Sequence, residues 1–411
     1  MPAVKGRSAE QARADLPKPQ RGQLTIALLA ILVCALSLRA PLTGLSPISG
    51  EIFADLGVPL LVIGYIGSAG PLLLALTAMM SGYLMAVLSQ RLLAISATAL
   101  LALAIIGRSL AWDGTAFVLS AALVYVAIGI LNAVMPAFIG TRFGVSQVPL
   151  VTALYASVIA VGTSIAPLLA RWSVETSSWR LSSALWAVAA GSACVLIAAT
   201  KQPNRPASAL GAQRNRRRTR PSPRTRPSGD LIRITLLFAI TAFNAFAMFA
   251  WLPRILLDRN GVGASQSAWL LAIYALMAVP VGLVTPLLLR KRSRFTSVAL
   301  AGLLCFVVGY VFLSTGYVWA PLAGVIIGGC GQLLYSAGLV KIADLERESK
   351  VSGISGKVQG IGFALGSLGP VVTSALYELD GTGTTVCLLL AVLPSAALLI
   401  LRRSKKAIPG K

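Results

Sequence analysis

The chain is organised around residues 36–47, which read Leu36-Ser37-Leu38-Arg39-Ala40-Pro41-Leu42-Thr43-Gly44-Leu45-Ser46-Pro47. Arg39 is a permanent cation inside an apolar run that begins near Leu24, and two prolines and a glycine follow it. An arginine near the middle of a membrane helix costs roughly 2.5–3.5 kcal/mol on insertion scales. Backbone breaks at membrane depth are tolerated where the chain packs in protein or lines a water-filled path. The stretch therefore favours the positive end of a transport path, and the alternative is an Arg39 that snorkels outward.

The composition is that of an integral membrane protein. Of the 411 residues, 56% are hydrophobic and 12% are charged, whereas a soluble domain carries about 25% charged residues. The apolar residues form runs of about 20, the length that crosses a lipid bilayer as a helix. The net charge of +23 does not indicate nucleic-acid binding, because the positive residues are segregated into the loops between the runs.

Several classes of site find no support in the sequence. There is no histidine among the 411 residues, which argues against a zinc site or a histidine-based active site. The five cysteines all fall within apolar runs at unrelated spacings, so we expect small buried hydrophobes and no disulfide framework. We find no Walker-type loop, mid-membrane nucleophile or filter motif. We therefore expect no cofactor and no metal, and we disfavour an ATP-driven pump, an enzyme and a channel.

The apolar runs form two sets of six. They predict an all-α fold with twelve transmembrane helices in two pseudo-symmetric halves. The first set covers about 24–46, 60–82, 92–111, 115–138, 148–169 and 181–199, and the second about 231–252, 266–289, 295–314, 318–340, 354–376 and 383–401. The predicted domains are a disordered cytoplasmic tail (1–23), an N-terminal half (24–199), a basic cytoplasmic linker (200–230), a C-terminal half (231–401) and a second cytoplasmic tail (402–411).

The distribution of charge predicts the orientation. With the N-terminus in the cytoplasm, 30 of the 36 Lys and Arg residues fall in cytoplasmic segments. Of the other six, Arg39 and Arg108 lie within apolar runs, and four lie in outer loops: Arg171, Arg180, Arg254 and Arg259. This is a strong positive-inside signal. We therefore predict a multi-pass protein of the inner (plasma) membrane with both termini in the cytoplasm.

Proline and glycine recur at matching places in the two halves. Pro47 ends the first run and Gly57 follows ten residues later, while Pro253 follows the seventh run and Gly263 comes ten residues after it. Matching interruptions of this kind point to a transporter site. Pairs of small residues four apart also predict close helix contacts; they are Gly162 with Ala166 and Gly362 with Gly366.

The sequence resembles the major facilitator superfamily, and within it the cyanate and 2-nitroimidazole permease group. The residues that carry the resemblance are residues 39–43 with Pro47, residues 132–136, Tyr155, Trp179-Arg180, Trp251-Leu252-Pro253, and Gln359-Gly360 with Gly369-Pro370. The resemblance implies alternating access of two six-helix halves. One departure concerns the loop after the second run, where residues 82–86 lack the aspartate of the superfamily's usual gate motif.

The candidate substrate-binding residues are polar side chains deep in the apolar runs. Along the first run, Ala35, Arg39, Thr43 and Ser46 share one helical face, which suits a cavity lining. We predict that Arg39 binds the substrate, that Asn132, Asn244, Gln332 and Gln359 orient it, and that Tyr155 forms an aromatic wall. Each of the polar groups could instead make a helix–helix hydrogen bond. For Arg108 we expect snorkelling or a pair with Asp113.

The positions of the acidic residues indicate the class of substrate. All 13 lie in tails, loops or span ends, whereas proton-driven exporters of cationic drugs usually need an intramembrane carboxylate. A buried arginine suits an anionic or electron-rich solute, to which it offers planar bidentate donors. We predict a monomeric secondary transporter of a small anionic or polar solute, cyanate-like or nitroaromatic, with or without a coupling ion. The alternative within this class is a multidrug exporter of neutral compounds.

Overall fold

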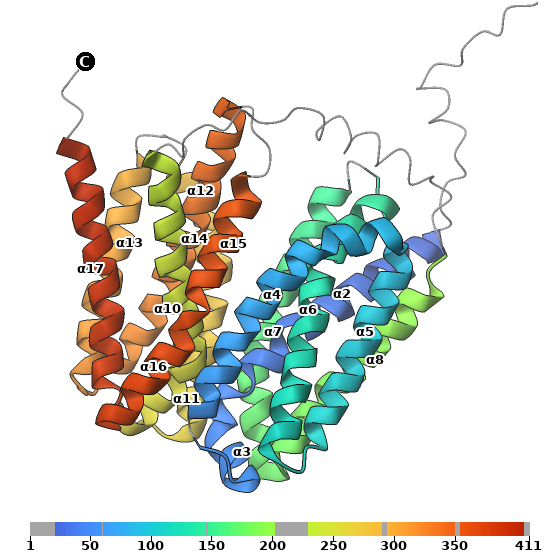
Figure 1. The fold of residues 1–411 in the computed structure, drawn as a ribbon, viewed down its shortest axis with the longest axis horizontal. Helices are drawn as coiled ribbons and strands as arrows, with labels where there is room; N and C mark the ends of the chain where they lie inside the picture. The colour runs from blue at the N-terminus through green and yellow to red at the C-terminus, as the bar shows by residue number, and fades with distance from the viewer. Residues whose placement is uncertain are drawn as a thin grey trace, which may run out of the picture.

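The computed structural model describes residues 21–59, 61–144, 147–201, 229–289, 294–349 and 354–406. Every regular element in these ranges is a helix, as the apolar runs predict (Figure 1). Residues 1–20, 202–228 and 407–411 lie outside the described residues, and with them most of the predicted tails and linker.

The N-terminal half contains α2 (Arg21–Thr43), η1 (Ser46–Ile48), α3 (Ser49–Leu56), α4 (Leu61–Val87), α5 (Gln90–Ser109), α6 (Gly114–Arg142), α7 (Val148–Thr176) and α8 (Trp179–Ala199). The C-terminal half contains α10 (Gly229–Asn260), α11 (Ala264–Leu276), α12 (Ala278–Leu288), α13 (Phe295–Ser314), α14 (Ala320–Ser349), α15 (Ile354–Gly366), α16 (Leu368–Asp380) and α17 (Thr384–Lys406).

Each of the twelve predicted spans coincides with one helix or with a broken pair. Ten described helical segments are long and apolar enough to cross a membrane, and shorter apolar stretches lie at Tyr65–Leu74 and Thr384–Leu398. The eighth span is interrupted at Met277, which the sequence patterns did not predict. The eleventh is interrupted at Ser367, within the glycine- and proline-containing stretch 366–370. Helix α17 continues to Lys406, beyond the predicted end of the last apolar run near residue 401.

The first helix of each half ends differently. In the N-terminal half α2 stops at Thr43, a new short helix begins around Pro47, and α3 closes at Gly57 with a left-handed φ of 62°. In the C-terminal half α10 runs unbroken through Pro253 to Asn260, and the left-handed residue is Gly261. The helix therefore continues past residue 252, where the seventh apolar run was predicted to end. A proline inside a helix removes one hydrogen bond, and tight packing around Trp251 and Leu252, both fully buried, accompanies this one.

Small residues bring helices into close contact in both halves. A Cβ atom on Gly162 of α7 would lie 2.5 Å from the carbonyl oxygen of Leu36 in α2. In the other half, a Cβ on Gly366 would lie 2.6 Å from Cβ of Ala242 in α10. These contacts confirm the predicted small-residue packing. They also pair the same helices in each half, the first with the fifth.

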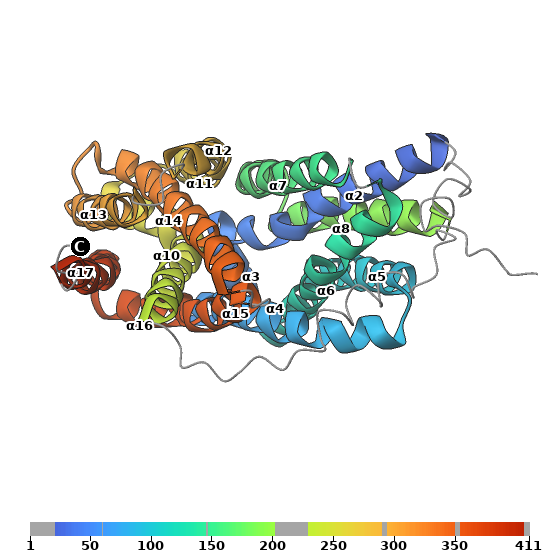
Figure 2. The ribbon, with the colours of Figure 1, turned by 90° about the horizontal axis from the view of Figure 1, so that it is seen from above.

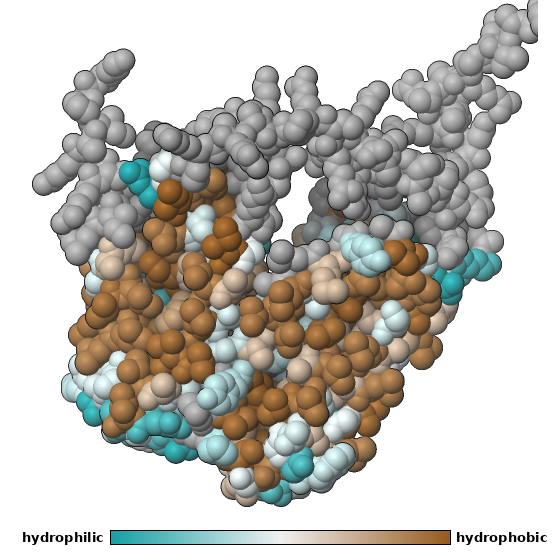
Figure 3. Space-filling model, viewed as in Figure 1, coloured by the Kyte–Doolittle hydropathy of each residue, from teal (hydrophilic) through white to brown (hydrophobic). Residues whose placement is uncertain are grey.

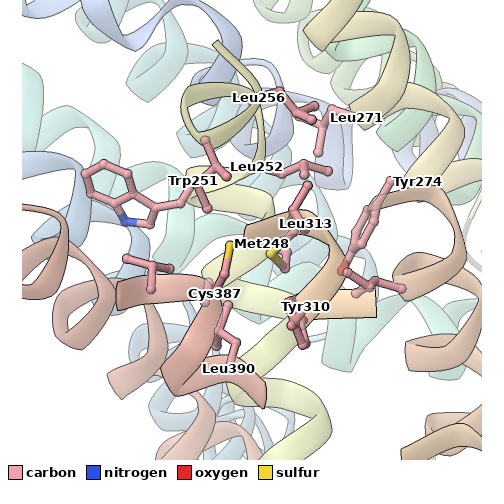
Figure 4. Close-up of a cluster of buried hydrophobic side chains, with 14 of the residues drawn as sticks. Met248, Trp251, Leu252, Leu256, Leu271, Tyr274, Tyr310, Leu313, Cys387 and Leu390 are labelled. Carbon is pink, nitrogen blue, oxygen red and sulfur yellow. The ribbon is translucent and has the colours of Figure 1, made fainter. Parts of the chain in front are cut away.

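Among the described residues, one hydrophobic core cluster joins the two halves. One cluster belongs to the N-terminal half, whereas another contains buried residues of both halves, including Ile52, Phe117, Trp251 and Leu271. Figure 4 shows its C-terminal part, where side chains of α10, α11, α13 and α17 converge. Figures 1 and 2 show the two groups of helices side by side, close together at the end that carries α3 and apart at the other. The apolar outer surface in Figure 3 suits contact with lipid.

Candidate functional site

A cavity of about 680 Å³ lies between the two halves. Helices α2, α4, α6 and α7 line it on one side together with η1 and α3, and α10, α11, α12 and α14 line it on the other. The volume is in the usual range for small-molecule sites. Most lining side chains are apolar or small, and the described lining residues include no carboxylate.

Arg39 lies in the wall of this cavity, on the last two turns of α2. Its side chain is half-buried, and within the described residues its guanidinium makes no hydrogen bond or ion pair. Tyr155, in the core of the N-terminal half, and Tyr335, in the opposite wall of the cavity, both lie within electrostatic range of Arg39. The guanidinium is therefore accessible to a ligand or to water in the cavity.

The polar face predicted along the first helix is present in part. Thr43 and Ser46 line the cavity beside Arg39, whereas Ala35 is fully buried. Oγ1 of Thr43 donates to the carbonyl oxygen of Thr163 in α7 at 3.1 Å. Oγ of Ser46 donates to the carbonyl oxygen of Ala250 in α10 at 2.7 Å, so that η1 contacts the opposite half.

The opposite wall is neutral. Gln332 of α14 lines the cavity, and its Nε2 donates to Oγ of Ser336 at 2.9 Å. Tyr335 of α14 and Phe246 and Phe249 of α10 also line the cavity. This wall offers an amide, a phenol and two rings, which suit a planar or electron-rich solute.

The other predicted site residues do not line the cavity. Tyr155 is buried in the core of the N-terminal half, and Asn132 is half-buried on α6. Asn244 is fully buried, and its Nδ2 donates to the carbonyl oxygen of Ile240 within α10. Gln359 lies half-buried on α15. Of the six predicted residues, the structure thus brings only Arg39 and Gln332 together at the cavity.

The sequence patterns did not predict several residues that line the cavity. Tyr125 reaches the cavity because Gly70 leaves space for its ring, and a Cβ on that glycine would lie 2.2 Å from it. On α7, Ser157, Ala160 and Thr163 form a small face at helical spacing. That spacing was visible in the sequence, whereas the Gly70–Tyr125 contact joins two separate helices and had no local signal.

Arg108 does not take either of the roles predicted for it. Its side chain is 1% exposed, and Nη1 donates to the carbonyl oxygen of Pro41 at 2.7 Å. Asp113 instead caps α6 by accepting from the backbone N–H of Ala116. The Pro41 carbonyl oxygen can accept this bond because the backbone N–H of Leu45, which would donate to it in a continuous helix, donates to the carbonyl oxygen of Leu42 at the end of α2. Arg108 thus satisfies a carbonyl oxygen that the break after α2 leaves without its helical partner.

Charged residues cluster where the halves meet. Arg171 of α7 pairs with Glu51 at 2.5 Å and with Glu175 at 3.1 Å, and Ser265 of the opposite half donates to Glu175. Of these contacts, the hydrogen bond from Ser265 to Glu175 crosses between the halves, at the end of the molecule that carries α3, and Arg171 holds Glu175 in place for it.

A second pair of contacts anchors α3 to its own half. Asp55 accepts hydrogen bonds from Arg180 and from the Trp179 indole, and these bonds hold the pKa of the Asp55 carboxyl below its ordinary value. The described residues contain no cluster of three His, Cys, Asp or Glu side chains that could hold a metal ion.

Comparisons with known proteins agree on one family. The sequence model described as Major Facilitator Superfamily matches residues 27–373. The cyanate transport protein CynX of Escherichia coli (strain K12) is 26% identical over 366 residues, covering 86% of this chain and 90% of that protein. The uncharacterized transporter YycB of Bacillus subtilis (strain 168) is 24% identical over 164 residues, or 39% of this chain and 40% of that one.

Solved structures of transporters share the fold. A crystal structure of the peptide transporter POT in complex with alafosfalin superposes with a TM-score of 0.73 at 16% identity, covering 98% of this chain and all of that one. The D-xylose–proton symporter gives a TM-score of 0.69 at 14% identity, covering 92% and 97% of the two chains. At these identities the likeness concerns the fold alone.

Proposed function

The chain belongs to the Major Facilitator Superfamily, and from that premise we propose that this secondary transporter moves a small anionic or electron-rich polar solute. It is a multi-pass membrane transporter and not an enzyme. Cyanate-like ions and nitroaromatic compounds are the two members of this class that the proposal covers. The cyanate transport protein among its relatives supports the first of them.

The observation that carries the proposal is the isolated positive charge of Arg39. Its guanidinium lies in the cavity wall with no ion pair or hydrogen bond among the described residues, and no described lining residue is acidic. A cationic substrate would meet this charge without a compensating carboxylate. An anion or a nitro group would accept two parallel hydrogen bonds from the planar guanidinium.

The remaining predicted residues act around this contact. Gln332 offers an amide from the opposite half, and Tyr155 lies behind α2 within electrostatic reach of Arg39. Asn132, Asn244 and Gln359 are away from the wall of this conformation, so we propose that they orient the helices rather than the bound solute. A solute held between Arg39 and Gln332 would touch both halves, which is what alternating access requires.

The orientation of the protein belongs to the same proposal. The basic segments point to an inner-membrane protein with both termini in the cytoplasm and the end that carries α3 outside. The cavity then opens inward, and the Arg171–Glu175–Ser265 contacts close the outer side. We propose that the monomer transports the solute alone or with a coupling ion.

The test measures binding and uptake by the purified chain in proteoliposomes. Cyanate and a nitroaromatic anion should raise the melting temperature and be taken up, whereas urea, a neutral amide of similar size, should do neither. Arg39→Gln should weaken anion binding by about 10- to 100-fold, since a charge-assisted hydrogen bond contributes about 1.5–3 kcal/mol. Arg39→Lys should be intermediate, because an ammonium group cannot make the bidentate contact. Unchanged affinity in the folded Arg39→Gln protein would rule the proposal out.

A second candidate is an exporter of neutral compounds. The largely apolar lining favours it, because such a lining suits a neutral compound. The volume of about 680 Å³ also favours it, because a triatomic anion needs far less space. It predicts that neutral aromatic compounds stabilise the protein and that their binding is indifferent to Arg39→Gln. The same thermal-shift measurements therefore separate the two functions.

The orientation has its own test. Single cysteines at Ser208 and Thr382, in a chain whose five native cysteines are replaced by alanine, should react with an impermeant maleimide from opposite sides of the membrane. Thr382 should react in intact cells and Ser208 only after the cells are opened. Reaction of both from the outside contradicts the orientation.

A further inference from the structure

Arg108 is a buried cation with one hydrogen bond and no ion pair among the described residues. The side chain lies in the last turn of α5 and is 1% exposed. Nη1 donates to the carbonyl oxygen of Pro41, but the buried Nε has no hydrogen-bond partner within the described residues. Burying an ionised group without a counterion is costly. The single hydrogen bond to Pro41 needs only a donor, which a neutral amide could supply.

No carboxylate among the described residues neutralises this charge. Tyr125 is the titratable side chain with which Arg108 interacts electrostatically. The nearest acids in sequence are engaged elsewhere, Asp113 at the N-terminus of α6 and Asp55 with Arg180. The carbonyl end of α2 carries a partial negative charge that offsets part of the guanidinium charge, and the rest remains.

The charge lies directly behind the wall of the cavity. Tyr125 lines the cavity and lies within electrostatic range of Arg108. Pro41, which accepts its hydrogen bond, is two residues from Arg39 in α2. In a low-dielectric interior a charge acts over several ångströms with little screening. Its field therefore reaches the space in which a solute would bind.

We infer that Arg108 is a second fixed positive charge of the substrate site and a determinant of its selectivity for anions. It acts through Tyr125 and through the end of α2 without touching the solute, so it is a positioning and selectivity residue. This inference deepens the proposed function, because it assigns the site two cations and no described acid. Arg108 would attract anions into the cavity and disfavour cations of equal size.

The experiment reads the electrostatic potential of the cavity with a chemical probe instead of a substrate. Ser157 lines the cavity and is exposed, so Ser157→Cys in a chain whose native cysteines are replaced by alanine provides a reactive thiol. Its rates of reaction with anionic sulfonatoethyl and cationic trimethylammonioethyl methanethiosulfonate are compared as a ratio. Measurements in 1 M salt, where the Debye length is about 3 Å, suppress the field of the exposed basic loops.

Three substitutions separate charge from hydrogen bonding. Arg108→Lys keeps both, Arg108→Gln keeps a donor without the charge, and Arg108→Met keeps neither. We expect the anion-to-cation rate ratio to fall about three- to tenfold in the Gln and Met variants and to survive in Lys, since the two reagents differ by two charges. Thr382→Cys, in the turn between α16 and α17, is the control whose ratio should not change.

The opposite results overturn the inference. A ratio that Arg108→Gln leaves unchanged would make Arg108 a structural donor to Pro41 and nothing more. If the neutral variants do not fold, Arg39→Gln decides: a remaining preference for the anionic reagent supports a second cation, and a ratio equal to that at Thr382→Cys excludes it. Failure of the proposed function looks different, because then cyanate and nitroaromatic anions are not transported although the reagent ratio still responds to Arg108.

Discussion

The first helices of the two halves began with similar sequence signals and ended as different structures. In the N-terminal half the chain breaks after Thr43 and continues as η1 and α3, whereas α10 runs through Pro253 without a break. The broken end places Arg39, Thr43 and Ser46 in the cavity wall, while α10 contributes Phe246, Phe249 and Ala250. The pseudo-symmetric scaffold thus carries an asymmetric site, with the Arg39 charge on the N-terminal wall and the neutral amide of Gln332 on the C-terminal wall.

The largest expected effect concerns a feature that α2 and α10 share: each is in close contact with a glycine of the fifth span of its own half. Gly162→Ala places a Cβ 2.5 Å from the Leu36 carbonyl oxygen, and Gly366→Ala places one 2.6 Å from Ala242. Overpacking of this kind costs about 1–3 kcal/mol, so both variants should unfold at lower temperature than the parent. Gly191→Ala is the matched control, because its Cβ would meet nothing within 4 Å. A loss in only one of the two variants would show that the halves do not share this packing.

The second prediction concerns the asymmetry of the cavity walls. Gln332→Leu removes a neutral amide from the C-terminal wall, and a neutral hydrogen bond contributes about 0.5–1.5 kcal/mol. Anion affinity measured by thermal shift should fall about 3- to 10-fold, less than in Arg39→Gln. Gln332→Glu should be worse than the leucine variant, because it places a carboxylate in the same cavity as Arg39. If Gln332→Leu exceeds Arg39→Gln in effect, the charged wall is not the dominant one.

The third prediction concerns the point where η1 meets α10. Ser46→Ala removes the hydrogen bond to the Ala250 carbonyl, which links the halves at the closed end. A loss of about 1 kcal/mol should raise the outward-open population about fivefold. The measurement is labelling of Ser157→Cys from outside intact cells. Ser109→Ala is the control, since that hydroxyl bonds within its own helix, and an equal rise in this control would contradict the prediction.

The smallest effect concerns the Asp55 contacts that hold α3, a short helix that is absent where α10 continues unbroken. Asp55→Asn weakens the contacts with Arg180 and Trp179. Because the pair is exposed, the loss should be at most about 1 kcal/mol of stability. The folded-state pKa of Asp55 lies below its ordinary value of 3.8, so this contribution is present above that pH and is lost as the pH falls through the folded pKa. The melting temperatures of parent and variant should therefore converge in acid, and a gap that widens there would contradict the assignment.

The sequence by itself determined the membrane class, the twelve spans and the family. Runs of about 20 apolar residues, basic loops and the Arg39–Pro47 stretch are local features, so they can be recognised without knowing which helices touch. The same holds for Arg39, whose cost in a bilayer is a property of the residue and its depth. The expected close packing at Gly162 and Gly366 followed from small residues at helical spacing.

Only the tertiary structure decided which deep polar residues face the cavity. Asn244 and Gln332 looked alike in sequence, but one is fully buried within its helix bundle and the other lines the wall. Tertiary contacts also decided how the first helix of each half ends. Arg108 of α5 donates to the Pro41 carbonyl oxygen where α2 breaks, whereas α10 continues through Pro253 without a break. Helical spacing defines a face, but the neighbouring helix decides whether that face meets protein, lipid or the substrate path.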